Sequence, residues 1–292
     1  MFSYRHAYHA GNHADVLKHL VLMLCLDHMN SKDKPYTVVD THAGAGLYAL
    51  DSEPAQRTGE CIDGIGRLWE RKNLPAPLSD YMQLIRDLNS GSGKLRRYPG
   101  SPWIAERMTR EMDRLRFYEM HSTDFALLRR QYTKAGRRVS VEQIDGFDGL
   151  KASLPPASRR GLVLIDPSYE IKSDYMKVAT AVKDALKRFA TGTYLIWLPF
   201  LATIEARQLP EKLKKLPNTD WLCANLTVGT VPRNGRGMTG SALFVINPPW
   251  TLEAALRTAL PILAETLGND DKAGWSIDRH SAAPRRETPH ES

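Results

Sequence analysis

The stretch GLVLIDPSYE, residues 161–170, shows how this chain folds. Four apolar residues follow Gly161 and end at Asp166, which is the pattern of a short, fully buried strand. A proline stops the strand pattern, and Ser168 and Tyr169 follow it. A strand of this kind belongs inside a parallel sheet, because such strands are covered on both faces and show no polar alternation.

The same alternation of strands and helices continues on both sides of this stretch. Buried strands are expected at residues 36–40, 114–119, 138–145, 161–166 and 192–199. Helices are expected at residues 12–30, 102–113, 122–135, 173–190, 202–216 and 251–267. Residues 220–229 and 240–250 have the pattern of a closing hairpin. Strands that alternate with helices predict an α/β protein, in which a mostly parallel, doubly wound sheet has helices on both faces.

Two segments depart from this alternation. Residues 47–100 contain helical patterns but no convincing strand, so we expect a small helical insertion after the first strand. Residues 268–292 lose the apolar period and gain Pro, Arg and Ser, which predicts a disordered tail. The main domain is therefore expected to consist of residues 1–46 and 101–267.

The composition predicts a soluble globular protein with a small excess of positive charge. The 40 Lys and Arg residues outnumber the 33 Asp and Glu residues, and the resulting net charge of +7 favours a polyanionic partner. The three cysteines are far apart, and no His, Cys and Asp set has metal-ligand spacing, so no metal is expected. There is no signal-peptide pattern and no apolar run of membrane length. We therefore expect a cytoplasmic protein without a membrane partner, and a monomer.

Acidic residues close four of the expected strands. They are Asp40, Glu119, Asp145 and Asp166. Ligands bind at the carboxyl ends of the strands in a doubly wound sheet, so four acids there predict a ligand with several hydrogen-bond donors. Glu119 is placed to hold ribose hydroxyls, and Asp145 with Gly146 to lie beside an adenine ring.

The first expected strand leads into the turn THAGAG, residues 41–46. Gly44 and Gly46 have no Cβ, so a ligand can approach the backbone closely there. Together with the acids, this turn indicates an adenosine-like cofactor, either a dinucleotide or S-adenosylmethionine. A dinucleotide needs glycines and a helix N-terminus around its pyrophosphate, and this turn offers them poorly. S-adenosylmethionine has no phosphate and needs no such turn. The run Asp-Pro-Ser-Tyr at residues 166–169 favours it over a dinucleotide.

The run Asp-Pro-Ser-Tyr, residues 166–169, has the chemistry needed to hold the exocyclic amino group of a base. The lone pair of such a nitrogen is delocalised into the ring. The Asp166 carboxylate and the Pro167 carbonyl can accept its two hydrogens, which orients the lone pair and disperses the positive charge that develops. Tyr169 can stack on the flipped base. Acid-Pro-Pro-aromatic is the common form of this run, and we expect Ser168, at the position of the second proline, to be tolerated.

A second run, INPPW at residues 246–250, fits the acid-or-amide, Pro-Pro, aromatic pattern by its letters. It follows the last expected strand, far along the chain from the residues expected at the cofactor. Its two prolines are typical of a stop before the helix at 251–267. Asp166 is therefore the preferred catalytic residue.

Seven runs of the sequence are distinctive: SYRHAYHAGNHADVLKH, DTHAGAG, RTGE, YPGSP, RRGLVLIDP, RFATGTY and GMTGSALFVINPPW. Together they resemble the RlmJ family of ribosomal large-subunit RNA adenine-N6 methyltransferases, from residue 1 to about residue 267. The resemblance implies a Rossmann-like methyltransferase fold with a small helical insertion, and S-adenosylmethionine as the cofactor. It also implies methylation of N6 of adenine 2030 in 23S ribosomal RNA.

The positions that match the family imply roles for individual residues. Those that match cofactor contacts are His19, His42, Ser101, Glu119, Asp145, Gly146 and Asp166. Asp166 also matches the catalytic residue, and Tyr4 in SYRH resembles a residue that meets the substrate base. The family usually has Asp-Pro-Pro-Tyr, so Ser168 is the departure. It bears on the rate and on base geometry more than on the cofactor site.

Three alternatives stay open at this point. A DNA adenine-N6 methyltransferase would use the same run of residues. A catalytically silent RNA-binding factor would bind cofactor and RNA without turnover, if Ser168 impairs the site. A dinucleotide oxidoreductase would bind a nicotinamide nucleotide. For the leading hypothesis, the loops at residues 3–13 and 231–240 are the expected RNA contacts, because both are basic.

Overall fold

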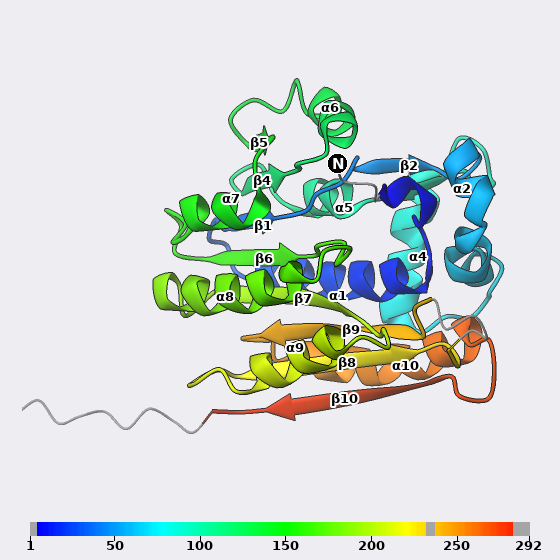
Figure 1. Ribbon diagram of the computed structural model, residues 1–292. Helices are drawn as coiled ribbons and strands as arrows, with labels where there is room; N and C mark the ends of the chain where they lie inside the picture. The colour runs from blue at the N-terminus through cyan, green and yellow to red at the C-terminus, as the bar shows by residue number, and fades with distance from the viewer. Residues whose placement is uncertain (1–4, 232–236, 283–292) are drawn as a thin grey trace, which may run out of the picture.

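The computed structural model describes residues 5–231 and 237–282 (Figure 1). Within these residues, one mixed sheet has the strand order β10-β8-β9-β7-β6-β1-β4-β5. In chain order its strands are β1 (Thr37–Asp40), β4 (Arg114–Tyr118), β5 (Val139–Glu142), β6 (Gly161–Ile165), β7 (Thr193–Pro199), β8 (Trp221–Thr227), β9 (Gly240–Ile246) and β10 (Gly274–His280). A separate small sheet pairs β2 (Leu47–Ala49) with β3 (Arg97–Pro99).

Helices cover both faces of the large sheet, which confirms the expected α/β fold. The α-helices are α1 (His13–Asn30), α2 (Glu53–Thr58), α3 (Arg67–Trp69), α4 (Ala76–Leu88), α5 (Ser101–Met108), α6 (Ser122–Gln131), α7 (Gly146–Ser153), α8 (Ser173–Arg188), α9 (Ile204–Lys214) and α10 (Leu252–Leu267). Helices α1, α5 and α10 share one hydrophobic core with the sheet, and α7, α8 and α9 share the core on the other face (Figure 1).

The central strand β6 explains why residues 161–165 are apolar at consecutive positions. It lies between β1 and β7 and runs parallel to both. Leu162 and Leu164 belong to the core that contains α1, whereas Val163 and Ile165 belong to the core that contains α8. Both faces of the strand are therefore buried, as the sequence pattern predicts.

Beyond β7 the sheet becomes antiparallel. β9 pairs with β7 and with β8, which confirms the closing hairpin expected from the sequence. β10 then pairs with β8 at the outer edge, with Gly274 opposite Thr227. The expectation of a disordered tail from residue 268 is therefore wrong for residues 274–280. Most of this edge strand is exposed and polar, with Ile277 packed against the core, so it lacks an apolar period. Residues 283–292 lie outside the described residues.

The insertion at residues 47–100 contains α2, α3, α4 and a π-helical turn, η2 (Ile62–Gly66). The expectation that it has no strand is wrong at both of its ends, where β2 and β3 pair antiparallel and close its base. These strands are only three residues long, too short to show a period in the sequence. Helix α4 buries Leu78, Tyr81, Met82 and Ile85, and it packs against α1 and α10. The insertion is thus fixed against the main domain.

Helix α1 brings charged residues into the interior. The Asn12 side chain caps its start by accepting hydrogen bonds from the backbone N–H groups of Ala14 and Asp15, both at 3.0 Å. The helix is then buried on most sides, and Asp15, Lys18 and His19 are buried together with its apolar residues. Charged side chains are rarely buried unless they are paired, so this part of α1 points to a polar site.

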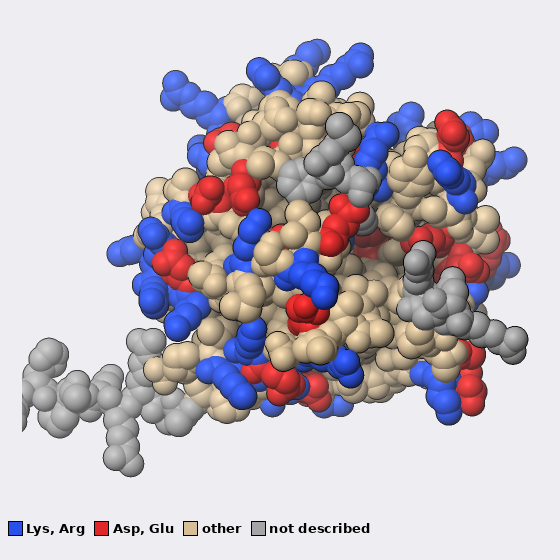
Figure 2. Space-filling view, in the orientation of Figure 1, with Lys and Arg blue, Asp and Glu red and all other residues tan. Residues whose placement is uncertain are grey.

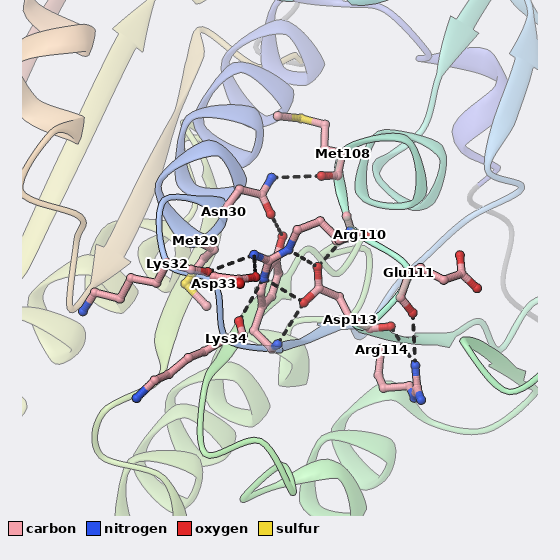
Figure 3. A network of polar contacts seen from close by, with 12 residues as sticks. Met29, Asn30, Lys32, Asp33, Lys34, Met108, Arg110, Glu111, Asp113 and Arg114 are labelled. Atoms are coloured by element: carbon pink, nitrogen blue, oxygen red, sulfur yellow. Dashed lines mark hydrogen bonds and ion pairs between the residues drawn. The ribbon is translucent and has the colours of Figure 1, made fainter.

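At the far end of α1, a polar network fixes the amino ends of β1 and β4 (Figure 3). Asp113 is fully buried, and its carboxylate accepts hydrogen bonds from Tyr36 N, Arg110 N, Arg110 Nε and Arg110 Nη2, at 2.8–3.2 Å. The Arg110 guanidinium also donates to the carbonyls of Lys32 and Lys34, both at 2.9 Å. The loops before the two strands are therefore tied to each other through one ion pair.

Candidate active site at the carboxyl edge of the sheet

A cavity of about 550 Å³ lies at the carboxyl ends of the parallel strands. Its walls come from the loops after β1, β4, β5 and β6, from the first turns of α1 and from the insertion. The sequence-predicted residues that line it are His19, His42, Ser101, Glu119, Asp145, Gly146, Asp166 and Pro167. The structure therefore brings together side chains from six separate segments of the chain. Tyr4 lies outside the described residues, and Tyr169 does not line the cavity.

The acid that ends β1 is buried directly behind the cavity. Ser101 Oγ donates a 2.6 Å hydrogen bond to Asp40 Oδ2, and the backbone N–H of His42 donates to Oδ1 at 3.2 Å. Burial raises the pKa of Asp40 to about 7, although both hydrogen bonds favour the charged form. The carboxyl group thus titrates close to neutral pH and holds the start of α5 against the end of β1.

The acid after β4 orders the glycine turn. Glu119 Oε2 accepts a 2.7 Å hydrogen bond from the backbone N–H of Gly44, and Oε1 accepts a 2.6 Å bond from the N–H of His121. Gly44 has φ +62°, and a Cβ there would lie 2.3 Å from the Tyr48 hydroxyl, so glycine is required. Burial raises the pKa of Glu119. Each carboxylate oxygen still has a lone pair for a ligand.

The acid after β5 differs from the expectation in one detail. The expected strand at 138–145 ends at Glu142, and Asp145 instead caps the N-terminus of α7 by accepting a 2.8 Å hydrogen bond from Phe147 N. The next residue, Gly146, packs against the carbonyl of Thr41, where a Cβ would lie only 1.8 Å from the oxygen. The pair Asp145–Gly146 is therefore held tightly against the turn after β1.

Two histidines line the cavity in their neutral forms, His19 fully buried and His42 partly buried. Burial lowers the pKa of His42 to about 4 and the pKa of His19 to about 3. The ring of His42 contacts Phe147 edge-on, with centroids 5.2 Å apart, and its Nδ1 lies 2.8 Å from Thr41 Oγ1. His19 Nδ1 lies 2.9 Å from the Tyr98 hydroxyl, and its Nε2 is buried without a partner among the described residues.

The acid after β6, which is mostly but not fully buried, forms an ion pair with a buried lysine. Lys18 Nζ lies 2.6 Å from Asp166 Oδ2 and 2.8 Å from Asp15 Oδ1. Asp15 Oδ2 in turn accepts from Gly11 N and contacts His6 Nε2, both at 2.9 Å. Burial lowers the pKa of Lys18, but the charges of Asp15 and Asp166 outweigh this and leave it raised. Burial raises the pKa of Asp166, and Lys18 opposes that rise.

The Asp166–Tyr169 loop has an unusual backbone. Tyr169 has φ +54°, a left-handed conformation that a bulky residue adopts only when its surroundings hold it there. Its hydroxyl donates a 2.8 Å hydrogen bond to the carbonyl of Trp197, and its ring packs on Tyr175 with centroids 4.4 Å apart. Tyr169 thus fixes the loop to the hydrophobic core. Its ring does not face the cavity as expected. Trp197 is the neighbouring aromatic that lines the cavity.

Asp15, Lys18 and Trp197 are among the cavity-lining residues that the sequence did not predict. The first two carry a signal in the sequence. They are charged residues three positions apart, on one face of a helix whose other residues are mostly apolar. Trp197 carries no such signal, because an aromatic residue in a strand usually belongs to a core.

Basic side chains surround this part of the molecule. In Figure 2, Lys and Arg side chains gather at the top of the face, over α6, and at its left, over α8, with acidic side chains interspersed. Helix α6 ends with Arg129 and Arg130, and α8 ends with Lys187 and Arg188. Residues 232–236 of the expected basic loop lie outside the described residues, and Gly237 and Met238 beyond them line the cavity.

The described part of the chain offers neither a metal-ligand cluster nor a membrane-spanning helix. Residues 5–231 and 237–282 contain no group of three or more His, Cys, Asp or Glu side chains that could hold a metal ion. No helix in these ranges has the length and apolar character that a membrane span needs.

The strand order, the antiparallel pair beyond β7 and the cavity beside the end of β1 define a Rossmann-like methyltransferase, a class that uses S-adenosylmethionine. The family model described as "Ribosomal RNA large subunit methyltransferase D, RlmJ" matches residues 33–280. The chain therefore belongs to the RlmJ family, as the sequence motifs suggested.

Individual relatives agree with this assignment. Ribosomal RNA large subunit methyltransferase J of Escherichia coli (strain K12) is 48% identical, over 91% of this chain and 94% of its own length. The protein of the same name from Haemophilus influenzae is 44% identical, over 95% of this chain and 98% of its own length. A crystal structure of a protein from Legionella pneumophila, 35% identical, superposes with a TM-score of 0.84 and covers 94% of this chain and 99% of that one.

Proposed function

We propose that this chain transfers a methyl group from S-adenosylmethionine to N6 of an adenine in 23S ribosomal RNA, adenine 2030 by family resemblance. Membership of the RlmJ family supports a large-subunit RNA as the substrate. The observation that carries the choice of N6 is the position of Asp166. Its carboxylate ends a central parallel strand, lines the cavity, and is held there by a buried lysine.

The residues around the cavity fit this cofactor. The cavity volume lies in the range of small-molecule sites. The unpartnered Nε2 of His19 is a buried polar atom that a ligand could satisfy. The carboxylates of Glu119 and Asp145 are acceptors suited to the hydroxyl and amino groups of a nucleoside. When bound, S-adenosylmethionine supplies an electrophilic methyl group on a sulfonium sulfur.

We assign roles to the cofactor-binding residues on this basis. Glu119 would hold the ribose hydroxyls, because it is the carboxylate after the strand next to β1. Asp145 and Gly146 would lie along the adenine ring, with His42 and Phe147 on the same side of the cavity. Further contacts would come from His19, Ser101 and Asp166. These roles follow the family resemblance, and the shared cavity supports them.

The chemistry at N6 would depend on Asp166 and Pro167. Asp166 Oδ2 is bound to Lys18, whereas Oδ1 has no partner among the described residues and can accept one N6 hydrogen. The Pro167 carbonyl would accept the other, so that the nitrogen lone pair points at the methyl group. N6 would bond to the methyl carbon as the bond between that carbon and sulfur breaks, and the proton that N6 then loses would pass to water in the cavity beside Asp166. The negative charge of Asp166 stabilises the positive charge that develops on nitrogen.

The adenine would leave its stack to reach this position, because a residue at the bottom of a cavity cannot reach N6 while the base is stacked in the RNA. Trp197 lines the cavity next to Tyr169 of the motif, and we propose that it stacks on the flipped base. Tyr169 would act by fixing the turn that aims Asp166 and Pro167. Tyr4 remains the proposed substrate contact of the N-terminal segment.

The test is a transfer of labelled methyl from S-adenosylmethionine to large-subunit ribosomal RNA that lacks the modification. Nucleosides from the digested product identify the methylated atom. Wild type is compared with Asp166→Ala, and the RNA is compared with a transcript in which guanine replaces adenine 2030 and with DNA of the same sequence.

We expect N6-methyladenosine from wild type on the unmodified RNA, and none from Asp166→Ala or from the guanine transcript. Equal or faster methylation of the DNA would transfer the assignment to a DNA methyltransferase. Binding of cofactor and RNA without any product would support a silent RNA-binding factor instead.

A further inference from the structure

Two tyrosines of the insertion connect it to the cavity through His19. Tyr81 lies on α4 and Tyr98 lies on β3, and both side chains are fully buried. Their hydroxyl oxygens are 2.8 Å apart, and the Tyr98 oxygen is 2.9 Å from His19 Nδ1. The chain Tyr81–Tyr98–His19 therefore runs from the interior of the insertion to the wall of the cavity.

The number of hydrogens in this chain selects one tautomer of His19. Each tyrosine has one hydroxyl hydrogen, and the three groups share two contacts. If Tyr81 donates to Tyr98 and Tyr98 donates to Nδ1, both hydrogens are used. In the reverse direction, the Tyr81 hydrogen has no acceptor among the described residues, although it is buried. The first arrangement leaves one group unpaired in the absence of a ligand, the Nε2–H of His19, whereas the reverse leaves two, the Tyr81 hydroxyl hydrogen and the Nε2 lone pair, so the first is favoured.

In the favoured arrangement, Nδ1 accepts and the hydrogen of the neutral imidazole is on Nε2. This nitrogen is the buried atom of His19 that lacks a partner among the described residues, and His19 lines the cavity. Burial keeps the ring neutral, with its pKa lowered to about 3. The ring is therefore set up as a hydrogen-bond donor toward a ligand, and the matching ligand group must be an acceptor.

We propose that Tyr98 and Tyr81 are positioning residues that hold His19 in its Nε2–H tautomer, so that it binds the methionyl carboxylate of S-adenosylmethionine. The inference rests on the cofactor of the proposed function. At the methionyl end of that molecule the carboxylate accepts hydrogen bonds and the ammonium group donates them, so a neutral N–H donor selects the carboxylate. Tyr81 and Tyr98, which do not line the cavity, would thereby contribute to cofactor affinity without contacting the cofactor.

The direction of the hydrogen bonds, from Tyr81 to Tyr98 to His19, sets the order of the expected effects. Tyr98→Phe removes the donor to Nδ1 and frees the ring to change tautomer, so we expect the dissociation constant for S-adenosylmethionine to rise about fivefold to tenfold. Tyr81→Phe leaves the Tyr98 hydroxyl able to donate to Nδ1, so a rise of about twofold is expected. Calorimetric titration without RNA gives both values.

The probe that separates positioning from general damage is 5′-methylthioadenosine, which keeps the nucleoside and the sulfur but lacks the methionyl carboxylate. Its affinity should be the same in wild type and in Tyr98→Phe. The matched control is Tyr194→Phe, which removes a fully buried hydroxyl bonded to the carbonyls of Ala185 and Phe189. This control should bind both compounds like wild type.

A second measurement reads the tautomer directly. Nitrogen-15 spectra of histidine-labelled protein should show the hydrogen of His19 on Nε2 in wild type and a mixture of tautomers in Tyr98→Phe. A wild-type ring with its hydrogen on Nδ1 would overturn the inference, and so would an equal loss of both compounds in Tyr98→Phe. If wild type binds S-adenosylmethionine and Tyr98→Phe binds it equally well, this inference fails alone. If wild type does not bind it, the proposed function fails as well.

Discussion

The amino ends and the carboxyl ends of the parallel strands bury charged side chains in opposite ways. We call these two sides of the sheet the amino edge and the carboxyl edge. At the amino edge, Asp113 accepts four hydrogen bonds, and its partner Arg110 also donates to two loop carbonyls (Figure 3). At the carboxyl edge, Asp166 has one oxygen without a partner among the described residues, and His19 has such a nitrogen. Asp40 is hydrogen-bonded but has a pKa of about 7.

The difference separates stability from function. A buried charge whose hydrogen-bonding capacity is fully used holds segments together and has nothing left for a ligand. A buried polar group with unused capacity and a shifted pKa costs stability, and such groups cluster where ligands bind. The same sheet thus carries a structural ion pair at one edge and a site at the other.

Replacement of Lys18, the buried cation at the carboxyl edge, has the largest expected effect. Lys18→Met leaves Asp15 and Asp166 buried without their shared cation. Asp166 is then more easily protonated, and its carboxylate is no longer held in the orientation that faces N6. We expect methyl transfer to fall about 10³-fold, measured as kcat/KM on ribosomal RNA. Arg110→Met, which removes a cation at the other edge, is the matched control, and a comparable loss of kcat/KM in it would contradict the division between the two edges.

The converse change tests the amino edge. Asp113→Ala removes the acceptor of the Tyr36 N–H and of the Arg110 side chain. The carboxylate is fully buried but Arg110 is partly exposed, so we expect the free energy of unfolding to fall by about 3 kcal/mol, the lower end for a broken buried pair. Urea denaturation measures it. Methyl transfer per folded molecule should stay at the wild-type value, and a loss that persists where the variant is fully folded would refute the division of roles.

A third change replaces Asp40, the buried acid of the carboxyl edge whose pKa is raised. The folded-state pKa of Asp40 is about 7, above the ordinary value of 3.8, so the folded protein binds more protons than the unfolded chain between these values. Stability from this group is therefore present below about pH 4 and is lost as the pH rises to about 7. Asp40→Asn has no such loss, so its stability relative to wild type should increase by roughly 2 kcal/mol between pH 5 and pH 8. Thermal unfolding without cofactor measures this, and a constant difference across that range would show that Asp40 is ionised throughout.

The sequence was sufficient for the parallel part of the sheet and for the acids at its carboxyl edge. Strands such as β6 are buried on both faces, so their apolar runs stand out, and the ends of parallel strands must meet. Three features escaped prediction. β10 is a mostly exposed edge strand, β2 and β3 are too short for a period, and Asp145 belongs to a helix cap rather than a strand.

The missing parts of the site depend on long-range contacts. Lys18 reaches Asp166 across 148 residues of sequence, and no local pattern reports that approach. The burial of Tyr169 follows from its positive φ and from its bond to the Trp197 carbonyl, which comes from the next strand. Residue types and spacing could therefore place Asp166 at the site, but not the residues that hold it.

The smallest expected effect concerns Ser168, which stands where an Asp-Pro-Pro-Tyr run would have its second proline. Ser168 lines the cavity, and no described hydrogen bond uses its side chain. The turn is held instead by Tyr169, whose ring and hydroxyl are fixed in the core. Ser168→Pro should therefore change kcat for methyl transfer by less than about threefold, roughly 0.6 kcal/mol.

Single-turnover transfer to ribosomal RNA, beside wild type and Lys18→Met, measures this change. If wild type is inactive and Ser168→Pro restores transfer, the turn itself depends on the second proline. The site would then bind its ligands without completing the reaction. The geometry of Asp166 and Pro167 would be set by residue 168 rather than by the contacts of Tyr169 with the core.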